Sequence, residues 1–598
     1  MFLPSITQKI HRFIEESPPF RIFALLSVLG LLAFGNAVNH PFVHDDIVFI
    51  EDNPHIKEIN LVDIFLYTSS SAGKTPVINT YWRPLLELFY RLEYKLVGLN
   101  PAGYHFINVL IHILNSFLIY QIMFLVSNKR KAFALALAVV FLIHPVQTEA
   151  VACVSGISNL LFTLLILGSL LLYVRSAGQK KPGSFWASLA LFILALLTKE
   201  QAVILPFLIL LYELCFLDKR RALFKPGIYC YFLILLFYLA FRNYYIGSVL
   251  SHIGTNTSEL WLRLLATPRV LLMYLRVLFL PYDLHYYRST DILQPFLLPT
   301  ILLAIFLVVV FLVVQRTTWP KKTLLIFSVG WVLLCWGPVS TILPLINEYS
   351  LILTSEHFLY LPMVGVFLFL FTSIEGWTQR NSQRSLWVFL LVCVISLAVT
   401  IRQNTFWRGE IPLFQRTLRY QSEFGRVHSL LAGAYFWERQ YPQAIQEYKK
   451  AYAIMSGYLP KSQDKKSTKF YREFLKTICF NMAHSYEALH QYEEALHWLQ
   501  QAIALDPGDT TLYNNLGIDL ARLKKPLEAK EHFEKALAID PGNVMAKTNL
   551  ATIYIFLNER EQALRLYGEI LQQHPEDAAT RANYQLLLSE LKAQQGQD

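Results

Sequence analysis

Long apolar runs separated by short polar loops occupy the chain from Phe23 to Ile401. A transmembrane helix needs about 20 mainly apolar residues, so this pattern predicts a membrane domain of about eleven spans. A further apolar stretch, 262–280, carries Arg263, Arg269 and Arg276, and we expect it to be a re-entrant or interfacial helix, the alternative being a twelfth span. The predicted spans are 22–39, 104–126, 132–150, 156–174, 185–198, 200–217, 228–246, 293–315, 323–345, 358–375 and 385–401.

Later in the chain the pattern changes to paired helices with a period of 34 residues, marked by Asn481, Asn515 and Asn549. This period is typical of tetratricopeptide (TPR) repeats, in which small residues let neighbouring helices pack closely. We predict an all-α fold made of a membrane domain (1–402), a linker (403–424) and a TPR α-solenoid (425–598). The predicted repeats are 425–458, 476–509, 510–543 and 544–577, followed by a capping helix at 578–594.

Charge gives the membrane domain an orientation. Only 16% of residues are charged and the net charge is +10, which fits the basic cytoplasmic loops of a membrane protein better than nucleic-acid binding, because no basic cluster is interleaved with aromatic residues. The loops after the second, fourth, sixth, eighth and tenth spans are basic. All of them fall on the side of the N-terminus, so the TPR domain is expected outside the cytoplasm.

The six cysteines are scattered without metal-ligand spacing and are expected to be inert core residues. A divalent cation is kept as a possible cofactor, and no cofactor is assigned with certainty.

This orientation places a set of ionisable residues at the outer ends of the spans. Such groups are costly at a membrane boundary and tend to be functional. Taken singly, each has a structural alternative: Asp45 and Asp46 as a helix cap, Lys199 and Glu200 as an ion pair at a hairpin tip, and His144 and Glu149 as solvated loop residues. The candidates are His44, Asp45, Asp46, Arg83, His144, Glu149, Lys199, Glu200, Glu356, His357 and Tyr360.

The chemistry that fits this outer face is attack on a lipid-linked, activated electrophile. Asp45 or Asp46 would be the general base for an acceptor hydroxyl, with Asp45 the preferred base and Asp46 positioning it or binding a divalent ion. Arg83 and Lys199 would neutralise a phosphate leaving group. The amphipathic stretch near 60–100 would either guide a polyprenyl chain in the interface or simply pack over the helix ends.

Five segments then carry a resemblance: "FVHDDIVFIEDNPHI", "YWRPLLELFYRLEYKLVGLNPAGYHFINVLIH", "IHPVQTEAV", "LLTKEQ" and "SEHFLYLP". Together with the TPR tail they resemble the transmembrane and TPR-containing O-mannosyltransferases, which are membrane glycosyltransferases of the GT-C class. The resemblance implies a polyprenyl-phosphate-linked sugar donor, a catalytic acid at Asp45 or Asp46, and a Lys-Glu pair at Lys199 and Glu200. The family often has arginine where this chain has His357.

The resulting hypothesis is a membrane glycosyltransferase that transfers a sugar, mannose by resemblance, to Ser or Thr of extracytoplasmic proteins. Glu200, His357 and Tyr360 are expected to join Arg83 and Lys199 at the donor phosphate. Asn481, Asn515 and Asn549 would line the TPR groove and hold an acceptor peptide, the alternative being that asparagine is simply common at this repeat position. A bacterial inner membrane with a periplasmic TPR domain is favoured over the endoplasmic reticulum. The competing functions are a ligase or polymerase of lipid-linked oligosaccharides and a membrane-anchored TPR scaffold without enzymatic activity.

Overall fold

The computed structural model of the chain describes residues 13–66, 82–179, 182–217, 226–246, 257–291, 296–340, 351–459 and 465–595. It divides the protein into two compact units, Met1–Tyr420 and Gln421–Asp598. Nearly all regular structure in these residues is helical, apart from the short antiparallel strands β1 (Arg288–Asp291) and β2 (Leu351–Thr354). The predicted all-α fold class is confirmed.

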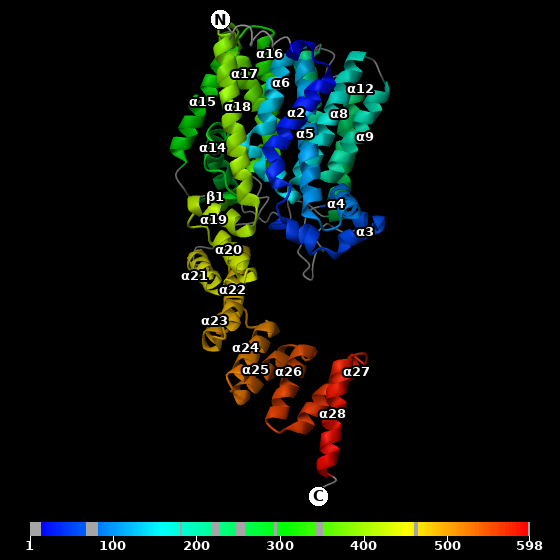
Figure 1. Cartoon of the computed structure of the whole chain (residues 1–598), viewed down its shortest axis with the longest axis vertical. Helices are drawn as coiled ribbons and strands as arrows, with labels where there is room; N and C mark the ends of the chain where they lie inside the picture. The colour runs from blue at the N-terminus through cyan, green and yellow to red at the C-terminus, as the bar shows by residue number, and fades with distance from the viewer. Residues whose placement is uncertain are drawn as a thin grey trace. The chain divides into compact units, whose positions relative to one another are not determined.

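The first unit contains a bundle of long apolar helices (Figure 1). A helix occurs at each expected span, but within the described residues only seven helices are long and apolar enough to cross a membrane, or eight if α6 and α7, which meet at 51°, count as one. The expected number of about eleven spans is therefore not confirmed. The helices of the bundle are α2 (Pro19–Phe34), α5 (Pro101–Val126), α6 (Lys131–Ile143), α8 (Ile157–Gln179), α9 (Pro182–Thr198), α10 (Leu205–Phe216), α12 (Pro226–Ile246), α14 (Thr257–Phe279), α15 (Leu297–Arg316), α16 (Lys321–Trp336), α17 (Pro362–Arg380) and α18 (Ser382–Asn404).

The shortfall has local causes. Helices α9 and α10 have 17 and 12 residues, which is short for a 30 Å hydrocarbon core. Helix α17 has 19 residues, but its last part is polar and it is not among the seven candidate spans either. Helix α14, which holds most of the ambiguous stretch 262–280 and contains Pro268, was not counted in the eleven and is also not a candidate span. In contrast, α15 is apolar on all sides over most of its length and none of its residues is buried by protein, as expected of a helix that faces lipid.

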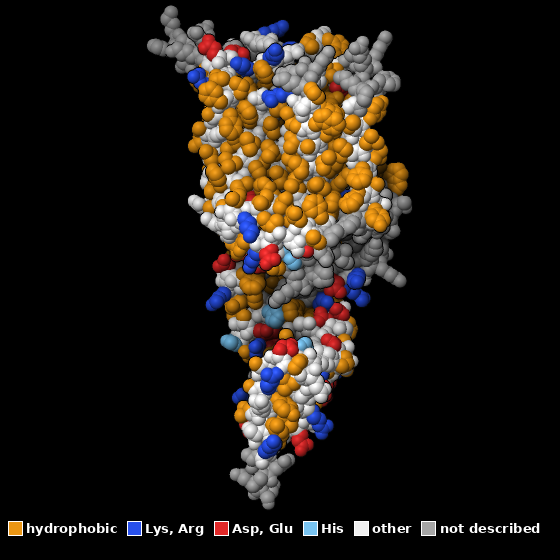
Figure 2. All heavy atoms as spheres, turned by 90° about the vertical axis from the view of Figure 1, so that its right-hand side faces the viewer, with side chains coloured by type: hydrophobic (Ala, Val, Ile, Leu, Met, Phe, Trp, Pro, Cys, Tyr) orange, Lys and Arg blue, Asp and Glu red, His pale blue; other side chains and the backbone are white. Residues whose placement is uncertain are grey.

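One end of the first unit gathers basic residues from segments far apart in the sequence. The Lys131 ammonium group contacts the backbone oxygens of Glu15 and Ser17. Arg130 and Lys321 both pair with Glu375 near the end of α17, the second at 3.1 Å. On the face shown in Figure 2, hydrophobic side chains form a continuous band over this unit, with Lys and Arg side chains at its upper end. Basic residues that follow the second and the eighth expected spans thus lie at one end of the unit.

Shorter elements cover the other end of the bundle, where α3 (Leu61–Leu66) and α4 (Pro84–Val97) lie in Figure 1.

The segment expected to be a linker, 403–424, is mostly helical. The 3₁₀-helix η9 (Thr405–Trp407) and α19 (Glu410–Tyr420) occupy most of it and belong to the first unit. Leu413 and Phe414 are each 1% exposed, and burying them holds α19 on the bundle. The other short elements are η2 (Ile47–Glu51), η3 (Pro54–Lys57), η4 (Pro145–Gln147), α7 (Thr148–Ala152), η5 (Val154–Gly156), η6 (Glu200–Ile204), η7 (Gly337–Val339) and η8 (Glu356–Leu359).

The second unit is a solenoid of helix pairs. Helix α22 begins at Lys465, before the repeat start expected near 476, because Tyr471 and Leu475 are buried and extend its packed face. The pairs are α20 (Gly425–Trp437) with α21 (Tyr441–Ser456), α22 (Lys465–Ala488) with α23 (Tyr492–Leu505), α24 (Thr510–Arg522) with α25 (Pro526–Ile539), and α26 (Val544–Phe556) with α27 (Arg560–Gln573), followed by α28 (Ala578–Gln595).

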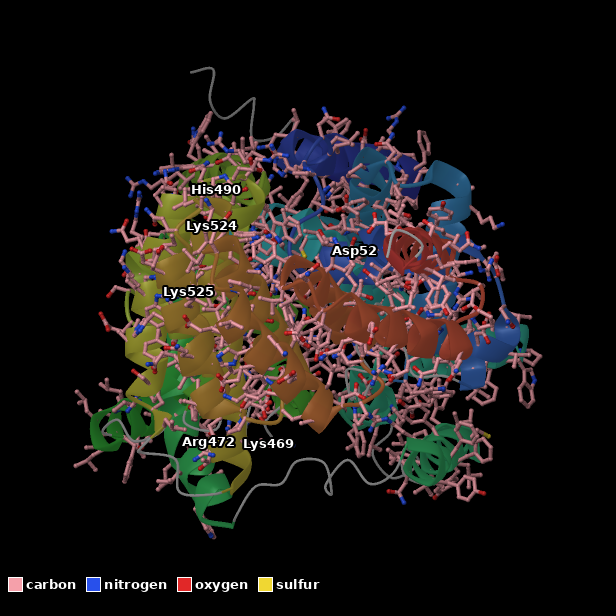
Figure 3. The ribbon with its side chains drawn as sticks, turned by 90° about the horizontal axis from the view of Figure 1, so that it is seen from below. Asp52, Lys469, Arg472, His490, Lys524 and Lys525 are labelled. Atoms are coloured by element: carbon pink, nitrogen blue, oxygen red, sulfur yellow. The ribbon has the colours of Figure 1, made fainter. Side chains whose placement is uncertain are left out.

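Each helix pair turns through one residue in the left-handed region, at Arg439, His490, Lys524 and Asn558, with φ between 58° and 62°. Figure 3 labels His490 and Lys524, which occupy this turn in successive repeats. Gly517 shows how tightly each pair packs, because a Cβ atom there would lie 2.7 Å from the Phe533 ring. Close packing at the small residues thus fixes the geometry of the solenoid.

Candidate active site

The two acidic residues after α2 have different environments. Asp46 is fully buried, and its carboxylate accepts hydrogen bonds from the backbone N–H groups of Ser155 (2.6 Å), Val154 (3.2 Å) and Val43 (3.3 Å). Burial raises the pKa of Asp46, while these three donors oppose the rise. Asp46 therefore joins its loop to η5, far away in the sequence, and its oxygens are already occupied.

Asp45 remains accessible. Its side chain is 46% exposed and lies 3.3 Å from the His44 ring. His44 has φ of 52°, an uncommon conformation for a residue other than glycine, and its N–H donates to Glu410 of α19 at 3.2 Å. The backbone on both sides of Asp45 is thus held, and the Asp45 carboxylate is the one that can meet a substrate.

Glu149 of α7 holds His357 of η8 in one orientation. Its two oxygens bind the Nδ1 atom of His357 at 2.8 Å and the N–H of the same residue at 3.0 Å. Glu149 is 4% exposed, whereas the His357 side chain is 23% exposed. The pair therefore joins two of the predicted segments and presents the histidine ring at the surface of the site.

Lys199 lies near the Glu149–His357 pair, since the charge of Glu149 acts on it, and Arg83 pairs with its neighbour Glu200. Arg83 binds Glu200 with two nitrogens, at 2.8 to 3.3 Å, and Arg242 of α12 lies 3.8 Å from the same carboxylate. Burial opposes ionisation of Glu200, but the charge and hydrogen bonds of Arg83, together with a backbone hydrogen bond and Arg242, lower the pKa of that carboxyl. Burial and the nearby Arg83 lower the pKa of Lys199 to about 7, and the Lys199 ammonium group donates to Asn159.

A recess opens between the Lys199 side and the His357 side. It is small, with room for about one water molecule. Most of its lining is apolar, and Asn159, Gln201 and His357 supply polar groups. Sequence reasoning missed Asn159 and gave no role to Gln201, which it noted only as part of the motif LLTKEQ. The lining residues are Asn159, Phe162, Gln201, Ile204, Cys335, His357, Phe358, Tyr360, Leu361 and Pro362.

Two predicted site residues instead serve the packing of the bundle. His144 bonds the Leu278 carbonyl through Nε2 at 2.9 Å, and its Nδ1 accepts from the N–H of Val146 at the start of η4. The Tyr360 hydroxyl is buried between His112 (2.7 Å) and Asn115 (3.1 Å). Both side chains have their polar atoms committed inside the protein, so neither group is directed at a phosphate.

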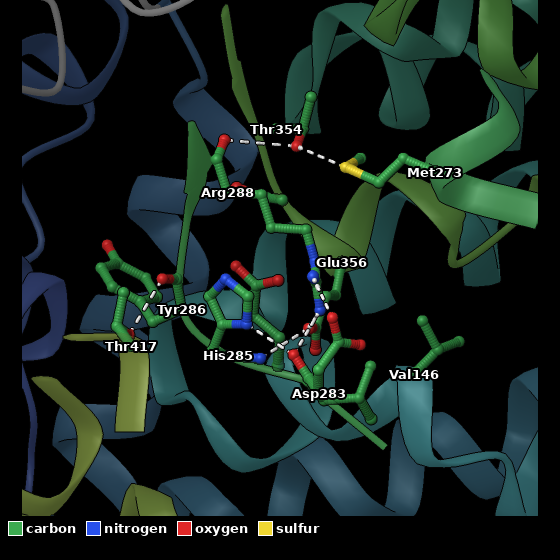
Figure 4. Close-up of polar contacts among 12 residues, drawn as sticks. Val146, Met273, Asp283, His285, Tyr286, Arg288, Thr354, Glu356 and Thr417 are labelled. Carbon is green, nitrogen blue, oxygen red and sulfur yellow. Dashed lines mark hydrogen bonds and ion pairs between the residues drawn. The ribbon is translucent and has the colours of Figure 1, made fainter. Parts of the chain in front are cut away.

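Glu356 belongs to a buried ionic cluster that sequence reasoning did not find (Figure 4). It accepts from Arg288 at 3.0 Å and from the N–H of His285 at 2.8 Å. Burial raises the pKa of Glu356 to about 8, Glu149 adds to the rise, and Arg288 opposes it. Arg288 also reaches Asp283, so the cluster couples Glu356 to the segment that follows α14.

The three asparagines of the solenoid are half-buried, and two of them already bond inside it. Asn549 donates to the buried Asn514 of the preceding repeat at 2.9 Å, and Asn481 is within hydrogen-bond reach of the Tyr448 hydroxyl. Sequence reasoning missed Asn514, which stands beside Asn515. The carboxamides therefore join successive repeats, and only their remaining atoms are available to a peptide.

Over the ranges that the structure describes, no three His, Cys, Asp or Glu side chains come together as a metal site would require. The expectation of a divalent cation therefore rests on the sequence alone.

Comparison with known proteins gives the same two-part picture. A family model described as dolichyl-phosphate-mannose-protein mannosyltransferase matches residues 80–245, and two tetratricopeptide-repeat models match 475–542 and 520–591. Protein O-mannosyl-transferase TMTC3 of Homo sapiens is 23% identical across 93% of this chain and 68% of its own length. The chain resembles the transmembrane and TPR-containing O-mannosyltransferases over most of its length.

Other matches are shorter. Protein O-mannosyl-transferase TMTC1 of Homo sapiens is 30% identical over 220 residues, which are 35% of this chain and 25% of that protein. The matched part thus spans about a quarter of that relative. Among solved structures, MamA covers 28% of this chain and 88% of its own with 20% identity and a TM-score of 0.24, and Pseudomonas aeruginosa PilF covers 33% and 87% with 24% identity and a TM-score of 0.23.

Proposed function

We propose that this integral membrane protein transfers a sugar, mannose by relation to its relatives, from a polyprenyl-phosphate donor to Ser or Thr of extracytoplasmic proteins. The observation that carries the proposal is the contrast between Asp45 and Asp46. One carboxylate is anchored and buried, and its neighbour is exposed in a loop held from both sides. That arrangement suits a positioned general base.

The reaction requires one bond to form and one to break. The acceptor oxygen attacks the anomeric carbon of the sugar, the bond from that carbon to the phosphate oxygen breaks, and the phosphate leaves with the electron pair. Asp45 takes the proton that the acceptor hydroxyl loses. No acid is needed at the phosphate, because the negative charge that the leaving group gains spreads over its oxygens and is stabilised by nearby cations.

We place the donor site at this recess, which must widen to admit a donor because it now has room for about one water molecule. Its apolar lining would receive the first part of the prenyl chain, while Lys199, His357 and Asn159 would lie beside the phosphate. Arg83 and Glu200 already form a bidentate ion pair with each other without a ligand. We therefore propose that they do not bind the phosphate but position Lys199, which precedes Glu200 in the chain.

The orientation expected from the basic loops places the catalytic end outside the cytoplasm, in a bacterial periplasm by preference, where the TPR unit would bind the acceptor. Mass spectrometry of extracytoplasmic proteins, from cells with and without this gene, tests the proposal. Loss of hexose from Ser or Thr peptides is the expected result. Unchanged protein glycans with altered lipid-linked oligosaccharides would indicate the ligase or polymerase, and no change in either would indicate the scaffold.

A further inference from the structure

A segment that carries no sequence motif, residues 280–288 (the connecting segment), leads from α14 into β1 beside the candidate site. Its backbone oxygens are bound by side chains from helices much later in the chain. Arg416 donates to the carbonyls of Leu284 (3.1 Å) and Tyr282 (2.8 Å), and Gln403 donates to Leu284 at 3.0 Å. These hydrogen bonds to its backbone carbonyls hold the irregular segment in one conformation.

Ionic groups hold the connecting segment at two further points. Asp283 accepts from Arg276 at 2.7 Å and from Arg288 at 3.2 Å, and Arg288 continues to Glu356 at 3.0 Å. Arg288 is 4% exposed, so removing either carboxylate would leave a poorly compensated buried charge. Figure 4 shows this cluster and, on its other side, Tyr286, whose carbonyl accepts from Thr417 at 3.0 Å.

The result of this anchoring is a tyrosine pair next to Asp45. The Tyr286 and Tyr287 rings are 4.0 Å apart between centroids, and the His44 ring is 5.1 Å from Tyr286. Burial, the neighbouring Tyr287 and the charge of Asp45 all raise the pKa of the Tyr286 hydroxyl, in that order. Tyr286 is 5% exposed, whereas Tyr287 is only half-buried, so Tyr287 is the one that can touch a substrate.

Backbone strain sets Tyr287 apart. Its φ is 48°, and that of His44 is 52°. An aromatic residue in this region is an outlier that costs roughly 1–3 kcal/mol and persists where its surroundings fix it. His44 and Tyr287 both contact the ring of Tyr286, beside the exposed carboxylate of Asp45. The side chains that bind the connecting segment hold Tyr287 in this conformation.

We propose that Tyr287 contacts the transferred sugar, its ring packing on the sugar face and its hydroxyl binding a sugar hydroxyl, with Tyr286 as its positioning residue. This inference rests on the proposed function. Tyrosine suits the role because it combines an apolar body with a polar tip. The connecting segment therefore distinguishes hexoses by their ring hydroxyls, next to the acceptor hydroxyl that Asp45 deprotonates.

The test uses the full chain in liposomes with polyprenyl-phosphate donors carrying either of two epimeric hexoses. Tyr287→Gly suits the left-handed backbone, so the melting temperature should stay within a few degrees, while kcat/KM falls at least about tenfold and the preference between the hexoses is lost. Tyr287→Phe should lose about fivefold, mostly in KM for the donor. Two matched controls should leave selectivity unchanged. Asn128→Gly makes the same kind of change at another left-handed position, φ 58° in the α5–α6 turn. Tyr282→Phe removes a hydroxyl from an exposed ring of the connecting segment.

If the wild type transfers sugar and the Tyr287 variants keep its rate and selectivity, the sugar-binding role of Tyr287 is overturned and the proposed function stands. A wild-type protein that transfers no sugar from either donor would overturn both. A large fall in the melting temperature of Tyr287→Gly with unchanged selectivity would assign Tyr287 to packing alone.

Discussion

At the scale of single residues, burial gives the adjacent carboxylates of Asp45 and Asp46 different roles: Asp46 is buried and anchored, and Asp45 is exposed. The sequence alone favours Asp45 as base only weakly, because both follow the first span directly. The three N–H donors on Asp46 belong to residues 43, 154 and 155, and no local pattern predicts that the last two approach it. For the same reason Asn159, Arg288 and Tyr287 were not predictable: their roles depend on contacts between distant segments.

Asp46→Asn is expected to reduce stability as well as activity. An asparagine can accept with only one oxygen, so at least one of the three buried N–H groups would lose its partner at a cost of about 1–3 kcal/mol. Purified Asp46→Asn protein in detergent should therefore melt several degrees below the wild type, while Asp45→Asn, at a half-exposed position, should melt with it. Equal melting temperatures for all three proteins would contradict the anchoring role of Asp46.

Lys199 gives the site a pH dependence. With its pKa lowered to about 7, the ammonium group is charged below that pH and neutral above it. Affinity for a phosphate-bearing donor should therefore weaken as pH rises from about 6 to about 8, an effect that Lys199→Arg should remove because arginine stays charged. Donor KM measured across this range in both proteins checks it, and parallel profiles would refute the assignment.

At the scale of elements, the repeats were the most predictable part of the chain. The 34-residue period and the small residues located the helices of the solenoid, because each repeat packs mainly on its neighbours. The expected linker at 403–424 differs from the structure since α19 buries Leu413 and Phe414 against the first unit. The sequence of a short amphipathic helix does not show which part of the protein its apolar face packs against.

The glycines of α20 and α24 should respond differently to a methyl group. A Cβ at Gly517 meets the Phe533 ring at 2.7 Å, whereas at Gly433 the nearest atom is the Tyr448 hydroxyl at an ordinary 3.7 Å. Gly517→Ala should destabilise the solenoid by about 1–3 kcal/mol, and Gly433→Ala should be neutral or stabilising by up to about 1 kcal/mol. Urea unfolding followed by circular dichroism measures both, and equal effects would argue against close packing at Gly517.

A carboxyl pair between α22 and α24 should make the solenoid more stable in acid. Asp519 is fully buried, and burial together with Glu487 raises its pKa to about 7. The folded state then binds a proton more tightly than the unfolded state, so stability is greatest below about pH 4 for this group and is lost as pH rises through about 7. Asp519→Asn should flatten this profile and raise the melting temperature at pH 8 by a few degrees; an unchanged profile would contradict the shared proton.

At the scale of the whole molecule, apolar runs and basic loops predicted a membrane unit followed by a solenoid, and the structure has both. The number of spans was harder to predict, because α9 and α10 are apolar enough to look like spans in sequence but have only 17 and 12 residues. The orientation stays a prediction. A cysteine placed at an exposed site such as Trp437 should react with an impermeant thiol reagent in spheroplasts, and labelling only after permeabilisation would reverse the topology.

The central claim is that Asp45 is the base of a polyprenyl-phosphate-dependent sugar transfer. The most direct measurement compares the wild type with Asp45→Asn, purified and reconstituted in liposomes with labelled polyprenyl-phosphate-mannose and a Ser/Thr-containing acceptor protein. The account predicts transfer by the wild type and a loss of roughly 10²–10⁴-fold in kcat for Asp45→Asn with normal insertion and melting temperature. Transfer by Asp45→Asn at the wild-type rate, or its absence in the wild type, would contradict it.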